Sequence, residues 1–549
     1  MKRGRVEDFS NPGLQAGGGR PGTRFRRSTG PPGGRPGTGT CRSTGPSVDR
    51  QGAGSRLQCS SLLVLPICLL LISCNQRDNA GVSEISVIPK PQSVAFSRGD
   101  FTLSRATQVK VDPSIPGTGE IADQMKRFIQ AGTLPEKGKG FIGLRIENHA
   151  DIKLSGYQLR IRKNGIRITA KDPAGLFYGI QTLKQLIPKD GSGKIDCLDI
   201  TDFPAFGWRG LMLDCSRTFL PKDYILKYID RLADIKMNVL HLHLTDDQGW
   251  RIEIRKYPDL TRICSKFDPQ YPGEVNGFYT QGDIREIVAY AAKSYITVVP
   301  EIEMPGHSTE IFAAYPELSC SGKKSVIFPY FKGPGVTEDI LCAGNDSVFI
   351  FMENVLSEVI ALFPSEFIHI GGDEAPKAAW KKCLKCQSRI QAEGLKDEAE
   401  LQSYFIRRIE KFINSKGRKL IGWDEILEGG LAENAAVMSW RGVQGGIEAA
   451  RQGHCVVMSP TSHCYFDYSN ETTSTEKVYS YEPVPEKLTG DQSKYILGAQ
   501  ANMWTHIART EAAIDAQVFP RLYALAEVLW TNPSTRDYAE LQRRISEGK

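Results

Sequence analysis

The chain has 549 residues and a net charge of +6, with 69 Lys and Arg side chains against 63 Asp and Glu. Its length exceeds that of one ordinary compact domain, and its 40% hydrophobic content is enough for a sizeable core. The charge is uneven, because residues 1–60 carry +8 and the rest of the chain carries −2. A positive charge confined to one end gives no support for nucleic-acid binding by the rest.

Residues 1–56 are rich in Gly, Pro, Arg, Ser and Thr and contain almost no aliphatic side chains. Such a segment cannot bury a core, so we expect it to be disordered. It contains a near repeat with a period of fifteen, at residues 18–31 and 33–46. The segment is either a basic arm that binds polyanions or, as we favour, upstream sequence that follows a start codon assigned too early.

Residues 57–74 have the features of a secretory signal peptide. Their apolar run follows Arg56 and is too short to cross a hydrocarbon layer of roughly 30 Å as a helix. The run ends in Leu71-Ile72-Ser73-Cys74, which resembles the bacterial lipobox and would make Cys74 the lipidated first residue. The alternative is a plain signal peptide. The lipobox predicts a lipid-anchored protein of the bacterial cell envelope, at the periplasm or outer membrane, that meets the membrane only through its anchor.

The chain has thirteen cysteines, nine of them after Cys74, so at least one of those nine stays unpaired. Cys320 and Cys342 flank a Gly-containing loop and could pair. Cys383 and Cys386 have C-x-x-C spacing, but no second Cys or His pair follows at zinc-ribbon spacing. A local disulfide or two plain thiols is therefore the favoured interpretation for this pair.

Residues 82–203 predict a small α+β domain. Two alternating runs, at 157–161 and 166–168, flank Asn164-Gly165, and this pattern is typical of a hairpin with a tight turn. Apolar residues at three- and four-residue intervals then predict a helix over 174–186. Pro204 and Gly207 mark the boundary to a second domain, expected over residues 204–535.

Eight short apolar runs recur in the second domain, mostly with amphipathic helical patterns between them. This alternation predicts an α/β fold in which a (β/α)8 TIM barrel follows the small domain. Most runs end in a charged, His or Trp residue, and the carboxyl ends of barrel strands form the active-site face. The runs are 210–214, 239–245, 297–304, 367–371, 419–423, 436–440, 456–459 and 498–504.

Carboxylates and indoles gather at these strand ends. Flat indole faces can stack on the C–H faces of a sugar ring, while carboxylates hold its hydroxyls, so the combination predicts a sugar site. Three Trp residues at equivalent strand ends favour a role in binding over a role in the core alone. The residues are Asp214, Asp246, Asp247, Glu301, Glu303, Asp373, Glu374, Trp423, Asp424, Glu425, Trp440 and Trp504.

His241-Leu-His243 supports a rival interpretation, because His-x-His at a barrel strand end is typical of metal-dependent amidohydrolases. However, both histidines precede the strand end, and the two-residue period of a strand can point them inward as packed core residues. We favour structural histidines and expect no metal ligands among the site residues.

Four ordered motifs carry a family resemblance. Together they resemble glycoside hydrolase family 20, the β-N-acetylhexosaminidases, over roughly residues 83–532, a range that includes the small domain this family places before its barrel. The motifs are Trp208-Arg209-Gly-Leu-Met-Leu-Asp214, His241-Leu-His-Leu-Thr-Asp246-Asp247-Gln-Gly-Trp250, Glu301-Ile-Glu-Met-Pro-Gly-His307 and His369-Ile-Gly-Gly-Asp373-Glu374.

The adjacency of Asp373 and Glu374 has a mechanistic meaning. Two neighbouring carboxyls cannot easily flank a glycosidic bond at the roughly 5 Å or more that ordinary glycosidases require, and family 20 is a substrate-assisted exception. The resemblance implies that the 2-acetamido oxygen attacks C1, giving an oxazolinium intermediate and retention. Glu374 then matches the general acid and base, and Asp373 matches the residue that orients the acetamido group.

Other roles follow from the same resemblance. Asp246 and His307 are similar to a pair that tunes the acid's proton affinity, and Arg209 is similar to the guanidinium that holds O3 and O4 of the sugar. Tyr465 matches the hydroxyl donor to the acetamido oxygen, and Asp467 a nearby polar contact. The expected walls of the acetamido pocket and ring face are Trp423, Trp440 and Trp504.

One residue departs from the family pattern. Many members have Glu two residues after the last-strand Trp, where it binds O4 and O6, but this chain has Trp504-Thr505-His506. An imidazole cannot reproduce the two hydrogen bonds of a carboxylate. His506 therefore leaves open the preference for gluco or galacto sugars and the tolerance of a substituent on O6.

The resemblance implies an exo-β-N-acetylhexosaminidase that releases terminal GlcNAc or GalNAc from glycans, without a metal or organic cofactor. Its partner is a glycan substrate and not nucleic acid. Two alternatives remain, a lipid-anchored glycan-binding protein that has lost catalysis and the metal-dependent amidohydrolase. An intact Asp373-Glu374 pair argues against the first, because a binding protein needs no acid there.

Overall fold

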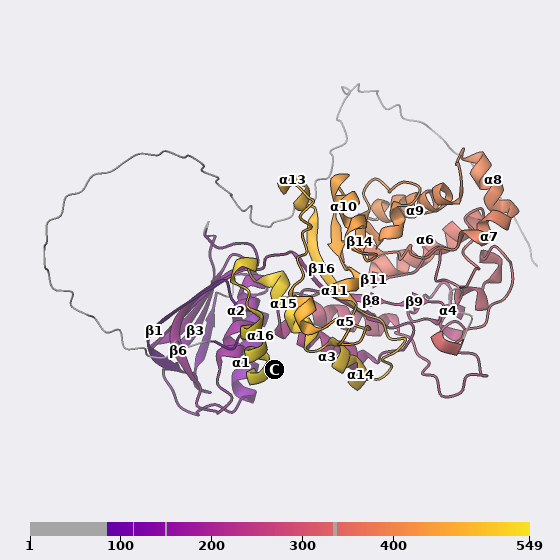
Figure 1. Ribbon diagram of the computed structural model, residues 1–549. Helices are drawn as coiled ribbons and strands as arrows, with labels where there is room; N and C mark the ends of the chain where they lie inside the picture. Colours follow the sequence, from indigo (N-terminus) through magenta and orange to yellow (C-terminus); the bar gives the residue numbers. More distant parts are fainter. Residues whose placement is uncertain (1–84, 113–114, 149–150, 333–336, 549) are drawn as a thin grey trace, which may run out of the picture. The chain divides into compact units, whose positions relative to one another are not determined.

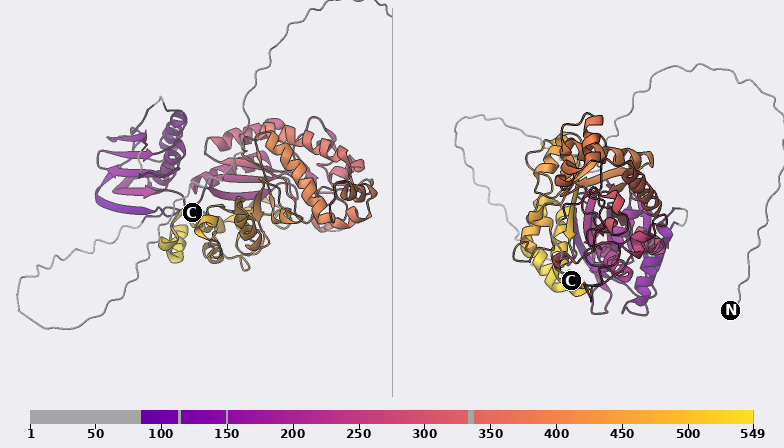
Figure 2. Two further views of the ribbon diagram at one scale, coloured as in Figure 1. Left: turned by 90° about the horizontal axis from the view of Figure 1, so that it is seen from above. Right: turned by 90° about the vertical axis from the view of Figure 1, so that its right-hand side faces the viewer.

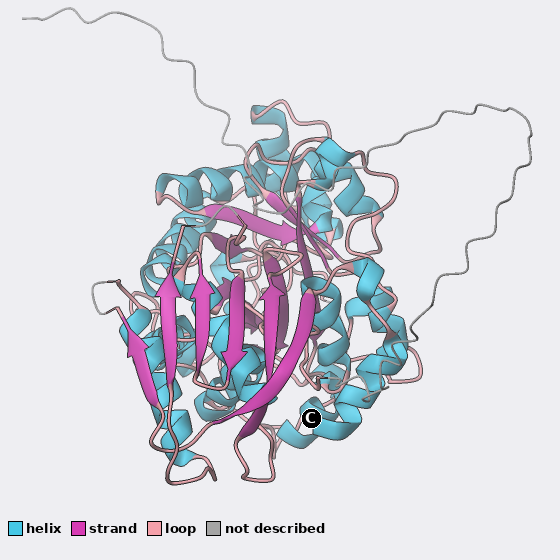
Figure 3. Cartoon of the chain, turned by 90° about the vertical axis from the view of Figure 1, so that its left-hand side faces the viewer, coloured by secondary structure: helices cyan, strands magenta, loops and turns pink. Residues whose placement is uncertain are grey.

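The computed structural model describes residues 85–112, 115–148, 151–332 and 337–548. Its first domain is built on a six-stranded mixed sheet with strand order β1-β6-β4-β5-β3-β2 (Figure 3). The leader, the signal segment and Cys74 lie outside the described residues. The sheet strands are β1 (Ser93–Thr102), β2 (Gln108–Val111), β3 (Phe141–Ile146), β4 (Tyr157–Arg162), β5 (Gly165–Ala170) and β6 (Lys194–Asp202).

The predicted hairpin is confirmed, because β4 and β5 pair antiparallel and Arg162 stands opposite Gly165. Their alternating apolar side chains pack against two helices, α1 (Thr118–Ala131) and α2 (Pro173–Leu186), which lie on one face of the sheet (Figure 1). The side chain of Asp172 caps the start of α2 by accepting a hydrogen bond from the Gly175 backbone N–H.

The second domain is a closed barrel of eight parallel strands, so the predicted fold class is confirmed. All eight predicted runs form barrel strands. They lie around the barrel in chain order, from β7 and β8 through β11 to β16, and β16 pairs with β7 to close the barrel. The strands are β7 (Trp208–Asp214), β8 (Val239–His243), β11 (Thr297–Glu301), β12 (Phe367–His369), β13 (Lys419–Trp423), β14 (Ala436–Ser439), β15 (Val456–Met458) and β16 (Ile496–Met503).

Helices and short helical turns surround the barrel strands (Figure 2). A small β-ribbon follows β8, formed by β9 (Thr245–Asp246) and β10 (Gly249–Trp250). The helices of this domain are α3 (Lys222–Asp234), α4 (Asp259–Arg262), α5 (Gln281–Ala292), α6 (Asp346–Leu362), α7 (Lys377–Lys382), α8 (Leu384–Ala392), α9 (Glu398–Ser415), α10 (Gln444–Arg451), α11 (Thr461–Cys464), α12 (Thr475–Tyr479), α13 (Gly490–Ser493), α14 (Glu511–Val518), α15 (Arg521–Trp530) and α16 (Tyr538–Gly548). None of the described helices combines the length and apolar character that a bilayer crossing requires.

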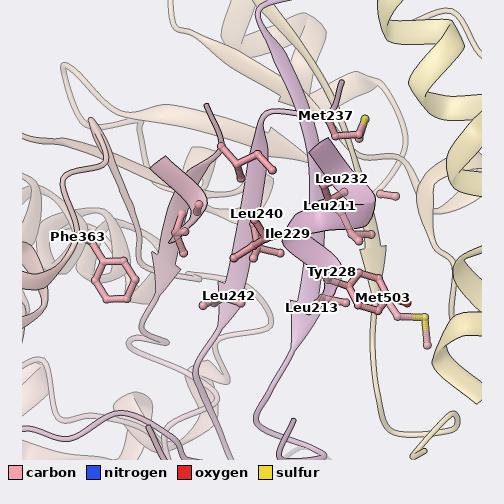
Figure 4. Close-up of a cluster of buried hydrophobic side chains, with 14 of the residues drawn as sticks. Leu211, Leu213, Tyr228, Ile229, Leu232, Met237, Leu240, Leu242, Phe363 and Met503 are labelled. Carbon is pink, nitrogen blue, oxygen red and sulfur yellow. The ribbon is translucent and has the colours of Figure 1, made fainter. Parts of the chain in front are cut away.

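The strands alternate between two buried surfaces. Leu211 and Leu213 of β7 and Leu240 and Leu242 of β8 pack outward with residues of α3, such as Ile229 (Figure 4). The residues between them point into the barrel, which holds an apolar floor at the amino ends and polar residues at the carboxyl ends. The inward direction of His241 and His243, which stand beside Met212 and Asp214 of β7, is as predicted.

The small domain and the barrel meet through a buried ion pair. Asp202, at the end of β6, lies 2.9 Å from the Lys236 ammonium, and both side chains are fully buried. The carboxylate also accepts hydrogen bonds from the Tyr157 hydroxyl and the Trp530 indole N–H. A buried charge requires this number of partners, because its hydration is lost.

The last helix, α16, adds a second link between the domains. Arg544 is buried, donates a hydrogen bond to the Val87 carbonyl oxygen and pairs with the carboxylate of Glu527 on α15. The segment before β1 is thus held by residues from the far end of the chain.

Replacing Asp202 by Asn should destabilise the protein by about 3 kcal/mol or more, because Lys236 would keep a buried charge without its partner. Chemical denaturation with a fitted midpoint and slope measures the change. The matched control is Asp199→Asn on the same strand, whose pairs with Arg160 and Arg162 are exposed and should contribute about 1 kcal/mol or less. Equal losses for the two variants would contradict the role given to the buried pair.

Candidate active site

Asp373 and Glu374 follow β12 on a turn that requires glycine. Gly371 has φ +66°, and a Cβ atom there would lie 1.6 Å from Oε2 of Glu303, so no other residue fits. Glu374 itself has φ +42°, a left-handed conformation that is uncommon for residues other than glycine. Such a backbone is found at functional sites where the surroundings hold it in place, which fits the predicted role of this carboxylate.

His307 joins these two carboxylates to a third. Its Nε2 atom lies 3.3 Å from Glu374 Oε2 and 3.7 Å from Asp373 Oδ2, and its Nδ1 atom lies 3.3 Å from Asp246 Oδ1. Burial acts to lower the pKa of His307, but Asp246 and Asp373 outweigh it and raise the pKa well above its usual value. The structure thus brings together Asp246, His307, Asp373 and Glu374 as the sequence predicted.

Glu374 and Asp373 differ in proton affinity. The hydrogen bond with His307 lowers the pKa of Glu374, whereas burial raises the pKa of Asp373. The Oδ1 atom of Asp373 is buried and has no hydrogen-bond partner among the described residues. A buried acceptor without a partner is costly, so this oxygen is suited to an N–H donor supplied by a ligand.

Glu301 lies at the centre of the barrel beneath this group. Its Oε2 atom is 2.5 Å from His243 Nδ1, and its Oε1 atom accepts a hydrogen bond of 2.8 Å from the Trp423 indole. His369 and His241 approach the same carboxylate at 2.9 and 3.2 Å. Burial acts to raise the pKa of Glu301, but the three histidines outweigh it and lower the pKa well below its usual value.

His243 connects Glu301 to Asp246, with its second ring nitrogen 2.9 Å from Asp246 Oδ2. Burial acts to lower its pKa, but Glu301 and Asp246 outweigh burial and raise the pKa to about 9. With a carboxylate at each nitrogen and a pKa of about 9, the ring is protonated at pH 7 and donates to both carboxylates. His241 belongs to the same buried cluster, where burial lowers its pKa to about 4.

Aromatic side chains form a continuous wall beside the carboxylates. The Trp423 and Trp504 rings lie 6.0 Å apart between centroids, and Tyr465 lies 6.4 Å from Trp504. Trp440 stacks on Tyr465 at 6.1 Å and donates its indole N–H to Glu425. The structure therefore brings together the three tryptophans and the tyrosine that the sequence singled out.

Asp467 and His506 lie at the Trp504 end of this wall. Burial raises the pKa of Asp467 to about 7, and its carboxylate lies 3.9 Å from His506 Nε2. The His506 ring packs at 4.9 Å from Tyr330. Burial, assisted by Arg217, lowers the pKa of His506, so the imidazole is neutral at pH 7. A neutral ring offers one donor and one acceptor where a carboxylate would offer two acceptors.

The predicted role of Arg209 is wrong. Arg209 is the second residue of β7, about 16 Å of strand before Asp214, and therefore lies near the amino end of the barrel. Its side chain is buried and donates hydrogen bonds to the Phe206 and Lys236 carbonyl oxygens and to the Tyr178 hydroxyl. This arginine supports the packing of the small domain against the barrel.

Arg217 is the guanidinium that the structure places in the site. Asp214 accepts hydrogen bonds from the Ser216 and Arg217 backbone N–H groups, which fixes the loop after β7. The guanidinium lies 2.5 Å from Asp246 and packs over the Trp504 ring at 4.8 Å. Sequence reasoning missed this residue, although its position just after a strand-ending aspartate was a usable signal.

The chain matches two family models in sequence. The catalytic-domain model of glycosyl hydrolase family 20 matches residues 206–533, and the domain 2 model of the same family matches residues 84–203. A beta-hexosaminidase of Porphyromonas gingivalis is 43% identical over 515 residues, which cover 87% of this chain and 65% of that protein. This chain therefore spans slightly less than two thirds of the length of that relative.

Solved structures agree with the sequence match. A beta-N-acetylhexosaminidase from Bacteroides fragilis is 34% identical with a TM-score of 0.74, over 84% of this chain and 94% of that one. An exo beta-N-acetylglucosaminidase from Vibrio harveyi in complex with N-acetylglucosamine is 29% identical with a TM-score of 0.75, over 84% and 76%. The predicted family is confirmed, and the amidohydrolase alternative is set aside. The chain belongs to glycosyl hydrolase family 20.

Proposed function

We propose that this protein is an exo-β-N-acetylhexosaminidase that releases terminal β-linked GlcNAc or GalNAc by substrate-assisted catalysis with retention. The observation that carries the proposal is the pair of adjacent carboxylates, both within 3.7 Å of His307 Nε2, with one buried Asp373 oxygen lacking a partner among the described residues. Neighbouring carboxylates on one side of a site suit a reaction in which the substrate supplies its own nucleophile.

The chemistry needs one proton donor and one orienting carboxylate. The acetamido oxygen attacks C1, the glycosidic bond breaks, and Glu374 gives its proton to the departing oxygen. Asp373 accepts a hydrogen bond from the acetamido N–H and stabilises the positive charge that develops on the oxazolinium ring. Water then attacks C1 while Glu374 takes its proton, and the C1–oxygen bond of the ring opens to restore the acetamido group.

Asp246 and His307 support the proton transfer without touching the reacting bond. Asp246 is held ionised, because Arg217 and His307 outweigh burial and lower its pKa. An ionised Asp246 keeps His307 positively charged beside Glu374. When Glu374 gives up its proton, the imidazolium stabilises the resulting carboxylate.

The binding groups surround that centre. Arg217, in place of Arg209, is the guanidinium suited to adjacent sugar hydroxyls, because its donors form a rigid fork. Trp504 offers a ring face beside it, and the Trp423–Trp440–Tyr465 side of the wall encloses the acetamido group. Burial, together with the nearby Asp373 carboxylate, raises the pKa of the Tyr465 hydroxyl, so Tyr465 stays a neutral donor.

The His506 side of the site is basic. Arg217, Lys332, His506 and Arg509 line one small pocket with Tyr330 and Phe331. His506 is neutral and Arg217 is paired with Asp246. However, Lys332 and Arg509 share a single carboxylate, Glu274, so these groups leave one positive charge without a partner carboxylate. Because many members of the family have a glutamate at the position of His506, where it binds O4 and O6, we propose that this enzyme accepts an anionic substituent on O6.

Export and attachment through Cys74 remain proposals supported by the sequence alone. The signal-like run and the Leu71-Ile72-Ser73-Cys74 ending support them. Metabolic labelling with a fatty-acid analogue, compared between the wild type and Cys74→Ala, tests the anchor. Turnover of a chromogenic substrate distinguishes the proposed enzyme from a glycan-binding protein without catalysis.

Glu374→Gln should lower kcat on a chromogenic β-GlcNAc glycoside by about 100-fold or more, because the amide cannot donate the proton. The matched control is Glu366→Gln at the opposite end of β12, where the carboxylate pairs with Lys419 and is exposed. Its kcat should equal that of the wild type. No turnover by the wild type, with tight sugar binding, would favour the glycan-binding alternative, and equal turnover by Glu374→Gln would contradict the acid assignment.

His307→Gln should lower kcat about tenfold or more and should shift the alkaline limb of the kcat profile to higher pH. The hydrogen bond and charge of His307 lower the pKa of Glu374, so their removal raises that pKa. Activity that needs protonated Glu374 is lost as the pH rises through this pKa, so the variant should lose activity at a higher pH than the wild type. His454→Gln, whose ring meets a backbone carbonyl instead, should leave the profile unchanged. An unshifted alkaline limb in His307→Gln would show that the contact does not tune the acid.

His506→Glu should reduce activity on a 6-O-sulfated β-GlcNAc glycoside relative to the unsulfated one by about tenfold or more, since a new carboxylate would repel the sulfate. His506→Gln, which adds no charge, is the control and should keep the ratio within about threefold, the size of a modest hydrogen-bond change. The ratio of kcat/KM for the two substrates gives the answer, with a GalNAc substrate assayed in parallel. A ratio that is the same in wild type and His506→Glu would place O6 away from this pocket.

A further inference from the structure

Four cysteines that are scattered in the sequence converge in the structure. Cys320 and Cys342 belong to the long connection between β11 and α6, whereas Cys383 and Cys386 lie at the junction of α7 and α8, beyond β12. All four are free thiols, and their sulfur atoms lie within 4.8 Å of one another. Cys342 and Cys386 are buried, and the other two are partly exposed at the rim.

The sulfur separations fit a tetrahedral metal site. Cys342 Sγ lies 3.6 Å from Cys383 Sγ and 3.7 Å from Cys386 Sγ, and Cys320 Sγ lies 3.7 Å from Cys386 Sγ. Four sulfurs around zinc at about 2.3 Å would stand about 3.8 Å apart at tetrahedral angles. These three separations agree with this value, and the other three sulfur pairs lie within 4.8 Å.

The surroundings are built for four sulfurs in close approach. Gly344 packs against the Lys385–Cys386 backbone so tightly that a Cβ atom there would lie 2.1 Å from the Lys385 carbonyl carbon. The Trp380 indole N–H donates to the Leu341 carbonyl oxygen at 3.0 Å, which fixes the two segments to each other.

We propose that Cys320, Cys342, Cys383 and Cys386 bind one structural zinc ion. Four thiols release four protons and bind Zn²⁺ as thiolates, with no oxidation or reduction of either partner. The resulting group has a net charge of −2, and Lys381, Lys382 and Lys385 flank the C-x-x-C segment with compensating positive charge. A four-sulfur shell leaves no open position for water, so the ion is structural rather than catalytic.

The site joins two loops that carry the catalytic residues. The connection after β11 contains His307, six residues after the strand ends, and the segment after β12 contains Asp373 and Glu374. A zinc ion between Cys320, Cys342 and the α7–α8 junction therefore fixes the two loops to each other outside the active site. The proposed zinc site replaces the expectation that Cys383 and Cys386 form a local disulfide or remain two plain thiols.

The test is the metal content of the purified full-length chain, prepared without chelators, together with X-ray absorption at the zinc edge. We expect about one zinc per chain and a shell of four sulfurs at about 2.3 Å. Cys342→Ser and Cys386→Ser should each retain less than about a fifth of that zinc, because a structural site needs all four ligands. Cys197→Ser, at a buried free cysteine on β6, should retain all of it.

Several results would overturn the proposal, and the wild type alone can give them even if a variant fails to fold. Zinc far below one per chain, with a mass lower by about 4 Da, would show two disulfides instead, since each one removes two hydrogens. Four thiols that alkylate freely in metal-free folded protein would show plain cysteines. Iron in place of zinc, or nitrogen and oxygen atoms in the zinc shell, would refute the metal or its ligands.

Discussion

The barrel depends on one buried carboxylate. Glu301 lies where the inward side chains of β8, β11, β12 and β13 meet, and a bare charge there would cost several kcal/mol of hydration. Three histidines and the Trp423 indole offset that cost. Because these partners lie on β8, β12 and β13, the carboxylate also fixes the register of those strands relative to β11. The same arrangement holds His243 charged, and His243 in turn holds Asp246.

Catalytic geometry is thus set from the inside outward. Glu301 orients His243, His243 and Arg217 orient Asp246, and Asp246 orients His307 against Glu374. Each step pairs opposite charges within a buried environment, where electrostatic interactions are stronger than in water. The glycines before Asp373 let the last carboxylate approach this chain of contacts. The proposed acid is consequently positioned by the barrel core as much as by its own loop.

The sequence predicted the barrel well because its signals are local. Each strand is a short apolar run with a polar residue at its end, so the sequence predicted all eight strands and the side of the barrel where Asp373 and Glu374 meet His307 and Asp246. Arg209 was assigned wrongly because its motif covers the whole of β7. Asp214 ends that strand at the active-site face, whereas Arg209 lies five residues earlier, near the opposite end of the barrel. The cysteine cluster was not predicted because the pair Cys320 and Cys342 is distant in sequence from the pair Cys383 and Cys386. The two pairs meet only when the loop after β11 packs against the loop after β12.

Arg544 has a consequence for how the molecule is assembled during synthesis. It reaches back from α16 to the Val87 carbonyl oxygen, beside the first described residues of the small domain, and shares Glu527 with the Lys90 backbone N–H. The ribosome makes these groups more than 450 residues apart. The small domain can therefore form its sheet early during synthesis. Its packing against the barrel is complete only after helix α16 has left the ribosomal tunnel.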